Sequence, residues 1–450
     1  MESNNRRNFL KKSALGATAF AMPLPMFPSS ILGANDRLNL GLIGCKGMGW
    51  SDTLSVLKNS GVKLIGLCDV DQNVLDQRLS EIDKIEGQDS KKVKTYGDYR
   101  ELLDNKDIDI VIIGTPDHWH CKMMVDACEA GKQIYVEKPI ANTIEECQIM
   151  LQAAKKYNSV VQVGQWQRSG PHYKKAIEIV QSGVLGKIRL VKVWAYQGWM
   201  RPVPIVADSA VPKGVDYQGW LGPAPSRPFN ANRFHFNFRW FWDYAGGLMT
   251  DWGVHEIDIA LFAMKALAPK SIMASGGKLA YPDDASETPD TLQALFEFEG
   301  FNMQWEHATG IDLGPYQKPE GIAFIGNNAT LVLNRGGYEV LYEKERDGYN
   351  GWGDNKIEPI ANMGVPEGVN YLDLHTTNFV DAVRADDPSS LNTYIESGSV
   401  AAINAQMGNI AFKTGEKLYW NAENNNFGDN EKANALIKAK YHNGIELPMV

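Results

Sequence analysis

The sequence has few cysteines, and their spacing argues against a zinc site or a disulfide framework. No two of them form the Cys-x-x-Cys pair that structural zinc sites commonly use. Cys121 and Cys128 lie seven residues apart on an expected helix, which would put their Cα atoms about 10 Å apart, too far for a disulfide. We therefore expect small buried side chains at Cys45, Cys68, Cys121, Cys128 and Cys147.

Positive charge is also in short supply, and long hydrophobic runs are missing. With 45 lysines and arginines against 54 aspartates and glutamates, the formal net charge is −9, which gives no support for nucleic acid or an anionic membrane as a partner. No apolar run reaches the roughly 20 residues that a membrane span needs. The chain shows no heptads or repeats, and its 450 residues predict a globular protein of two domains.

The first 34 residues are expected to be a targeting segment. Residues 5–12 read Asn-Arg-Arg-Asn-Phe-Leu-Lys-Lys and precede a weakly apolar stretch that prolines interrupt. This arrangement resembles a twin-arginine export signal, cleaved near Ala34, and should be excluded from fold reasoning. It predicts a periplasmic protein that is exported already folded. A basic tail without a targeting role is the alternative.

A glycine-rich loop separates an apolar run from a helical pattern in residues 38–69. It reads Gly44-Cys45-Lys46-Gly47-Met48-Gly49, a variant of the G-x-G-x-x-G spacing. Gly44 would allow a sharp turn, Gly47 would let the backbone approach a pyrophosphate, and the following helix would offer its N–H groups. Asp69 ends the next apolar run and would bind the adenosine ribose hydroxyls, which favours NAD over NADP. A glycine-rich loop in another α/β protein is the alternative.

Apolar runs and helical patterns then alternate up to residue 163, as in a doubly wound parallel sheet. The run at 108–113 is apolar enough to be buried on both faces. Ligand chemistry in such sheets collects at the carboxyl ends of the strands. This places five segments around one cleft: Gly44–Gly49, Asp69, Thr115–His120, Glu137–Pro139 and Gly164–Arg168.

The second half of the chain reads as strands and helices around an irregular insertion. Alternating patterns predict strands at 188–196, 291–298, 301–307, 321–325 and 329–333. Between Trp199 and Tyr244 the chain is rich in proline and aromatics. The aromatic run 233–242 fits a platform for a sugar ring as well as it fits a core or oligomer contact. A helix expected at 248–264 carries Asp251 and His255 at i and i+4 on one face, with Asp258 able to orient the imidazole.

Together these motifs resemble the glucose–fructose oxidoreductase / inositol dehydrogenase / rhizopine catabolism (Gfo/Idh/MocA) family. The matching features are the glycine loop, Thr115-Pro116 with His120, Glu137-Lys138-Pro139, and Asp251-Trp252-Gly253-Val254-His255. The resemblance implies an N-terminal Rossmann domain and a C-terminal α/β domain with a large, mostly antiparallel sheet. The outer face of that sheet commonly forms a homodimer or homotetramer interface. Asp117 departs from the asparagine that many members carry.

The resemblance also assigns roles and boundaries. It implies a signal at 1–34, an NAD-binding domain at 36–165, a substrate and oligomerisation domain at 166–420 and a tail at 421–450. Catalytic roles fall to Lys138, Asp251 and His255. Cofactor contacts fall to Gly44, Lys46, Gly47, Met48, Gly49, Asp69, Thr115, Pro116, His120, Glu137 and Arg168. A surface lysine and a satisfied core histidine are the alternatives for Lys138 and His255.

The expected reaction is hydride transfer between NAD and a hydroxyl-bearing carbon of a sugar, cyclitol or glycoside. His255 would take the hydroxyl proton, and Lys138 would stabilise the developing alkoxide. A redox-assisted glycosidase of the same fold is the alternative, although the similar exported N-acetylgalactosaminidases lack Glu-Lys-Pro. His118 and His120 alternate as metal ligands can, but no third ligand is spaced to join them, so we expect no metal.

Overall fold

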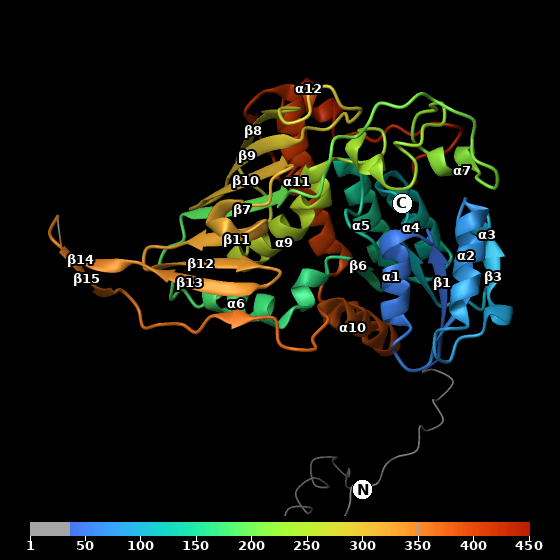
Figure 1. The fold of residues 1–450 in the computed structure, drawn as a ribbon, viewed down its shortest axis with the longest axis horizontal. Coiled ribbons are helices and arrows are strands. Elements are labelled where there is room, and N and C mark those ends of the chain that lie inside the picture. Colours follow the sequence, from blue (N-terminus) through green and yellow to red (C-terminus); the bar gives the residue numbers. More distant parts are fainter. Residues whose placement is uncertain (1–36, 350) are drawn as a thin grey trace, which may run out of the picture.

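The computed structural model describes residues 37–349 and 351–450 (Figure 1). The expected export signal at 1–34 lies outside the described residues. Within the described ranges, the main strands form a six-stranded sheet and a nine-stranded sheet, each belonging to its own domain. None of the helices described is long and apolar enough to cross a membrane.

The first domain is a parallel sheet in the order β3-β2-β1-β4-β5-β6, which confirms the doubly wound prediction. The order reverses between β1 and β4, and a crevice at that switch point is where such sheets bind ligands. Strand β4 is buried along its whole length, as its apolar sequence predicts. The strands are β1 (Leu38–Ile43), β2 (Val62–Cys68), β3 (Lys94–Tyr96), β4 (Ile110–Ile113), β5 (Gln133–Val136) and β6 (Val161–Val163). The helices are α1 (Gly47–Val56), α2 (Gln72–Ile82), α3 (Tyr99–Asp104), α4 (Asp117–Glu129) and α5 (Ile144–Tyr157).

The second domain is a mixed sheet in the order β16-β13-β12-β11-β7-β10-β9-β8-β17. Only β7 and β10 pair in parallel among these described strands, so the sheet is mostly antiparallel, as expected. Its strands are β7 (Leu190–Gln197), β8 (Ser271–Gly277), β9 (Thr291–Glu297), β10 (Asn302–Thr309), β11 (Glu320–Ile325), β12 (Ala329–Asn334), β13 (Gly337–Tyr342), β16 (Met363–Gly364) and β17 (Leu418–Tyr419). A separate hairpin, β14 (Lys344–Asp347) and β15 (Gly351–Asn355), projects from the sheet in Figure 1.

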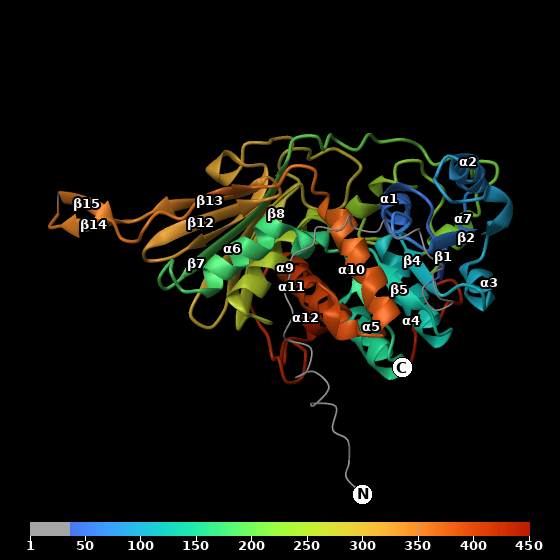
Figure 2. The ribbon, with the colours of Figure 1, turned by 90° about the horizontal axis from the view of Figure 1, so that it is seen from below.

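Helices cover one face of this large sheet. Figure 2 shows α6 (Pro171–Gln181), α9 (Gly253–Met264) and α11 (Ile395–Thr414) on the same side of it. Strand β9 alternates accordingly, with Leu292, Ala294 and Phe296 buried and the residues between them exposed or partly exposed. The hydrophobic core therefore lies between sheet and helices, and the other face is left uncovered over β8 and β9.

The last part of the chain returns to the first domain. Helix α10 (Tyr371–Ala385) packs on α1, where Ser55 Oγ donates to Asp373 at 2.6 Å. The segment predicted as a tail, 421–450, includes α12 (Glu431–Ala435) and lies against α5, where Tyr441 Oη donates to Glu146 Oε1 at 2.9 Å.

All five cysteines are free and buried, as their spacing predicts.

The insertion at 199–244 forms a small core of its own. It contains a short helix, α7 (Tyr217–Leu221), and a 3₁₀ turn at Asn237–Trp240. Most of its aromatic side chains are buried together, including Phe238, Trp240 and Phe241. The aromatic run is therefore mainly a packing feature, while Phe236 remains 54% exposed.

Candidate active site

The glycine loop has the shape that an anion-binding turn requires. Gly44 adopts φ +85°, and a Cβ there would lie 2.7 Å from the backbone of Gly114, so the turn excludes a side chain. At Gly47, by contrast, a Cβ would meet no described atom within 4 Å, which leaves open space beside the loop. No side chain caps the N-terminus of α1 among the described residues. Its first N–H groups can therefore bind a pyrophosphate.

Asp69 lies where a ribose-binding acid is expected, immediately after β2. Its two carboxylate oxygens accept the backbone N–H groups of Cys45, at 2.8 Å, and Asp71, at 3.0 Å. The carboxylate thus ties the glycine loop to the end of β2. Each oxygen keeps a further lone pair for a ribose hydroxyl.

Lys138 and Asp251 join the two domains at the carboxyl edge of the Rossmann sheet. Lys138 follows β5, and its Nζ donates to Asp251 Oδ1 at 3.0 Å and to the Asp251 carbonyl at 2.9 Å. Both side chains are largely buried, at 13% and 16% exposed. An ammonium has three hydrogens, so one remains for a substrate oxygen.

The helix expected at 248–264 is broken in two. Helix α8 (Leu248–Asp251) ends before α9 begins at Gly253, with Trp252 between them. His255 lies in the first turn of α9, buried, with its ring edge-on to Trp166 and Trp252. Its Nδ1 has no hydrogen-bond partner among the described residues. An orphaned buried nitrogen of this kind is typical of a site completed by a ligand.

Burial and nearby charges set opposite protonation states in this cluster. Burial lowers the pKa of His255 well below its usual range, and the positive charges of Lys138 and Arg335 lower it further. Burial alone would raise the pKa of Asp251, but Lys138 and Arg239 outweigh it and hold the pKa at about 2. Near neutral pH the cluster therefore contains a neutral imidazole, able to accept a proton, and an ionised aspartate.

Arg239 and Asp117 complete the surroundings of Asp251, and the sequence did not single out Arg239. Arg239 comes from the 199–244 segment, and its Nε lies 3.5 Å from Asp251 Oδ1. Asp117 opens α4 and is buried. Burial raises the pKa of Asp117 to about 8, so this carboxyl is mostly neutral at pH 7.

Glu137 supports the loop rather than lining open space. It is buried, and a Cβ on Gly164 would lie only 2.0 Å from its Oε1. The carboxyl of Asp52, on α1, faces it. Burial raises the pKa of Glu137 to about 7, and that of Asp52 well above its usual range. Its predicted contact with the cofactor stays a prediction.

His120 also holds the loops together. Its two ring nitrogens lie 2.8 Å from the carbonyl oxygens of Pro139 and Thr115. Burial lowers the pKa of His120 to about 4, so the neutral ring donates to only one of them at a time. The ring thus links the loop after β4 to the loop after β5, whose Lys138–Pro139 peptide bond is cis.

The role expected for Asp258 is wrong in this structure. Its two oxygens accept hydrogen bonds from Arg168 at 2.7 Å each, and no described hydrogen bond connects it to His255. Arg168 also stacks on Phe262 and donates to Ser397. The described contacts of Arg168 are therefore structural, and its predicted cofactor contact stays untested. The bidentate arginine–carboxylate geometry competes better for Asp258 than a single imidazole N–H would.

Arg335 is a site residue that sequence reasoning missed. It follows β12 in the turn to β13, and its guanidinium lies over the rings of Trp166 and Trp252, at 4.6 and 4.3 Å from their centroids. Both rings also contact His255. No local motif marks this arginine, because 80 residues separate it from His255 in the sequence.

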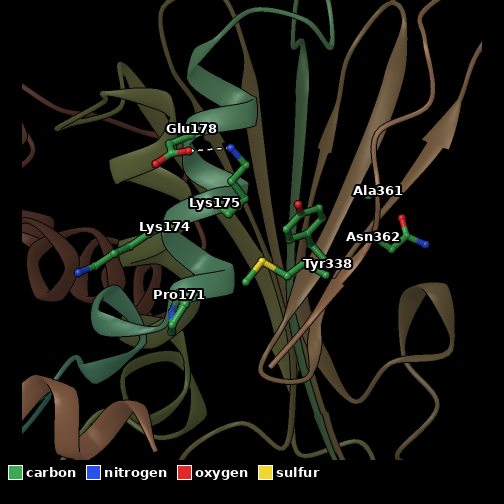
Figure 3. Close-up of a pocket in the computed structure, with 8 residues that line it drawn as sticks. Pro171, Lys174, Lys175, Glu178, Tyr338, Ala361 and Asn362 are labelled. Atoms are coloured by element: carbon green, nitrogen blue, oxygen red, sulfur yellow. Dashed lines mark hydrogen bonds and ion pairs between the residues drawn. The ribbon is translucent and has the colours of Figure 1, made fainter. Parts of the chain in front are cut away.

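A surface pocket lies away from this cluster. Figure 3 shows it between α6 and β13, with a volume of about 600 Å³. It is lined by Pro171, Lys174, Lys175, Glu178, Tyr338, Ala361, Asn362 and Met363. None of the predicted site residues borders it, and Lys175 pairs with Glu178 at 3.0 Å on its wall. We therefore do not assign it to the candidate active site.

Comparison with protein families identifies the two domains. Residues 38–165 match the "Oxidoreductase family, NAD-binding Rossmann fold" model. Residues 169–274 match its "C-terminal alpha/beta domain", and residues 225–332 match a further "GFO/IDH/MocA C-terminal domain". The chain belongs to the Gfo/Idh/MocA oxidoreductase family.

Curated relatives of this Gfo/Idh/MocA protein include proteins with glycosidase names. Glycosyl hydrolase family 109 protein 1 of Shewanella sp. (strain ANA-3) is 32% identical over 207 residues, which cover 42% of this chain and 45% of that protein. An alpha-N-acetylgalactosaminidase of Shewanella oneidensis matches equally, so the matched stretch spans less than half of each relative.

Solved structures share the fold at lower identity. Levoglucosan dehydrogenase, in complex with NADH and levoglucosan, has a TM-score of 0.63 at 18% identity and covers 85% of this chain and 99% of its own. The WlbA dehydrogenase of Bordetella pertussis, in complex with NADH and UDP-GlcNAcA, has a TM-score of 0.61 at 16% identity and covers 86% and 99%. At these identities the likeness concerns the fold alone.

The residues present fit the dinucleotide of the family. The uncapped start of α1 and the open space at Gly47 suit the pyrophosphate. Asp69, after β2, suits the adenosine ribose. Lys138, after β5, lies at the strand end where the nicotinamide would bind. NAD bound there would supply the hydride acceptor or donor.

We expect Asp69→Asn to reduce the preference for NADH over NADPH by roughly tenfold, because it removes the charge that repels a 2′-phosphate. Fluorescence titration of both cofactors gives the ratio of dissociation constants. Asp109→Asn, on the amino edge of the sheet, is the matched control, since the Asp109 carboxylate accepts the backbone N–H of Asn39, away from the glycine loop. A ratio unchanged in Asp69→Asn would refute the assignment of this carboxylate.

We expect the acid limb that His255 contributes to kcat/KM to lie well below pH 6.5. The reaction needs the unprotonated imidazole, and its lowered pKa keeps it unprotonated until the pH falls through that value. The pH profile should be measured also in Glu137→Gln and in Asp117→Asn, which remove the groups of pKa about 7 and about 8. An acid limb at pH 6.5 or above that persists in both variants would contradict this expectation.

Proposed function

We propose that this protein is an NAD-dependent oxidoreductase that transfers hydride between nicotinamide and a ring hydroxyl or ketone of a sugar or glycoside. The observation that carries the proposal is the Lys138–Asp251 ion pair beside the buried, neutral His255 at the carboxyl edge of the Rossmann sheet. Oxidation at C3 of a pyranose is the form of the reaction that we favour.

Each residue of the cluster has a defined task in this proposal. His255 accepts the hydroxyl proton of the substrate as hydride leaves the same carbon. Lys138 uses its third N–H to bind the reacting oxygen and stabilises the negative charge that develops there. Asp251 holds the ammonium in place through two acceptor atoms, and Arg239 helps to keep Asp251 ionised.

A redox-assisted glycosidase is the second candidate, because the curated relatives that match this chain bear glycosidase names. Transient oxidation to a ketone would acidify the neighbouring C–H and permit elimination of the glycosidic bond. In this chain, the oxidation step of such a glycosidase would use the same Lys138 and His255. The presence of Glu137-Lys138-Pro139 favours net oxidoreduction in this chain.

Two further expectations accompany the proposal. The sequence at 5–12 favours export by the twin-arginine route, so we propose a periplasmic enzyme whose bound NAD is recycled by a second substrate. We also propose a homo-oligomer formed through the uncovered face of the large sheet. Met273, Leu295 and Leu341 are exposed there.

Product analysis distinguishes the two activities. Purified protein would be incubated with hexoses and glucosides plus a sugar ketone as acceptor, and the products identified by mass spectrometry. We expect a product that lacks two hydrogens and retains its glycosidic bond. Cleaved glycoside without net oxidation would replace the dehydrogenase by the glycosidase.

We expect Lys138→Ala to lower kcat by roughly 10² or more, because the developing alkoxide loses its charged donor. Lys122→Ala is the control, since Lys122 pairs with Asp126 on the same helix and touches none of the site residues described. Full turnover in Lys138→Ala would overturn the mechanism for both candidate activities.

Leu295→Lys should convert the oligomer to monomers, because a charge would be buried in the proposed apolar contact. Light scattering after size exclusion gives the mass of the particle. Leu279→Lys, an exposed leucine in the loop after β8, is the control. A monomeric wild-type protein would refute the proposed interface.

A further inference from the structure

The 199–244 segment crosses from the large sheet to the Rossmann domain. Figure 1 shows α7 beside α2 at the far end of the molecule from the hairpin β14–β15, and Figure 2 shows the same neighbours from below. The segment brings its own aromatic core, in which Tyr217, Trp220 and Tyr244 are buried. It is therefore a preformed unit and not a loose connection.

Its first attachment is to the residues that follow β2. The Asp216 N–H donates to the Val70 carbonyl, and the Gln72 N–H donates to the Gly214 carbonyl, each at 2.8 Å. Asp71 and Val215 are paired between them in an antiparallel bridge. These residues come directly after Asp69, the acid placed to bind the adenosine ribose.

Its second attachment is to the residues that follow β4. Trp119 Nε1 donates to the Trp220 carbonyl at 3.1 Å, and His118 Nε2 lies 3.1 Å from the same oxygen. Gly222 packs so closely that a Cβ would lie 2.1 Å from the Trp119 ring. The segment thus spans the loops after β2 and β4, on either side of the β1 loop that would hold the pyrophosphate.

A strained residue closes this arrangement. His235 has φ +67°, a conformation that non-glycine residues rarely adopt, and its Nε2 lies 2.8 Å from Asp71 Oδ2. Both side chains are mostly buried, at 21% and 10% exposed. Strain of this kind persists only where the surrounding contacts enforce it. Four residues on, Arg239 reaches Asp251 at the catalytic end.

We propose that the 199–244 segment is a clasp over the adenosine end of bound NAD, and that the His235–Asp71 pair holds it shut. Release of the cofactor then requires the clasp to open, so NAD stays on the protein from one turnover to the next. His235 is a positioning residue, because it acts through Asp71 and not on the reacting atoms. The inference rests on NAD binding by the Rossmann domain and is independent of the substrate and of the reaction.

The test is the rate at which NADH leaves the full-length protein in the absence of substrate. Protein loaded with NADH is mixed with excess NAD, and the loss of bound NADH fluorescence is followed in time. His235→Gly removes the side-chain contact with Asp71 and accepts the positive φ without strain, so the segment can still fold. We expect its NADH dissociation rate to rise about tenfold, since such changes act mainly on dissociation.

Three further variants separate the clasp from general loosening. Asp71→Asn should accelerate release similarly, and the double variant should add little, because both remove one interaction. Arg227→Gln is the matched control in the same segment: Arg227 pairs with Asp243 and Glu287 at 2.9 Å, away from Asp71. Its NADH dissociation rate should equal that of the wild type.

Three outcomes would overturn the clasp. They are an unchanged dissociation rate in His235→Gly, an unchanged dissociation rate in Asp71→Asn, and an equal acceleration in Arg227→Gln. The thermal midpoint of each variant without cofactor shows whether the fold is kept. Because no substrate is present, failure here leaves the proposed reaction untouched, and failure of the product analysis leaves the clasp untouched.

Discussion

The geometry of the candidate active site depends on the buried ion pair between Lys138 and Asp251. One partner follows strand β5 of the Rossmann sheet, and the other ends the short helix that leads into α9. Removing one member of a buried pair leaves the other charge unpaired, which commonly costs about 3–5 kcal/mol of folding free energy. The pair therefore fixes how the two domains meet, and it does so where hydride transfer would take place.

Burial acts on the pKa values of Asp251, Asp117 and His255 alike, yet these groups reach different charge states because their neighbours differ. Asp251 lies beside Lys138 and Arg239 and stays ionised. Asp117, at the start of α4, is mostly neutral at pH 7 because burial raises its pKa to about 8. His255 is driven neutral by burial and by the charges of Lys138 and Arg335. A buried cluster with an ionised aspartate, its cationic neighbours and a neutral base is suited to moving a proton and a hydride in opposite directions.

Both proposed activities, dehydrogenation and redox-assisted glycoside cleavage, would use this cluster up to the ketone. Relatives with glycosidase names match less than half of the chain, and solved dehydrogenase structures share its fold. What separates the outcomes is whether the ketone leaves or eliminates its neighbouring group. A cofactor that stays bound would suit both proposed activities. The glycosidase would regenerate the nicotinamide by reducing the ketone again, whereas the dehydrogenase would regenerate it with a second substrate.

Local sequence determined the glycine loop, Asp69, the parallel strands and the spacing of Asp251 and His255, because turn chemistry and hydrophobic periodicity act over short stretches of chain. Only the tertiary structure decided which distant groups meet. It paired Arg168 with Asp258 instead of leaving Asp258 to His255, and it brought Arg335 between Trp166 and Trp252. It also turned the aromatic run of the 199–244 segment into a packed unit against the residues after β2 and the start of α4. Such contacts depend on competition between partners far apart in sequence, where burial and geometry, not spacing, select the pair.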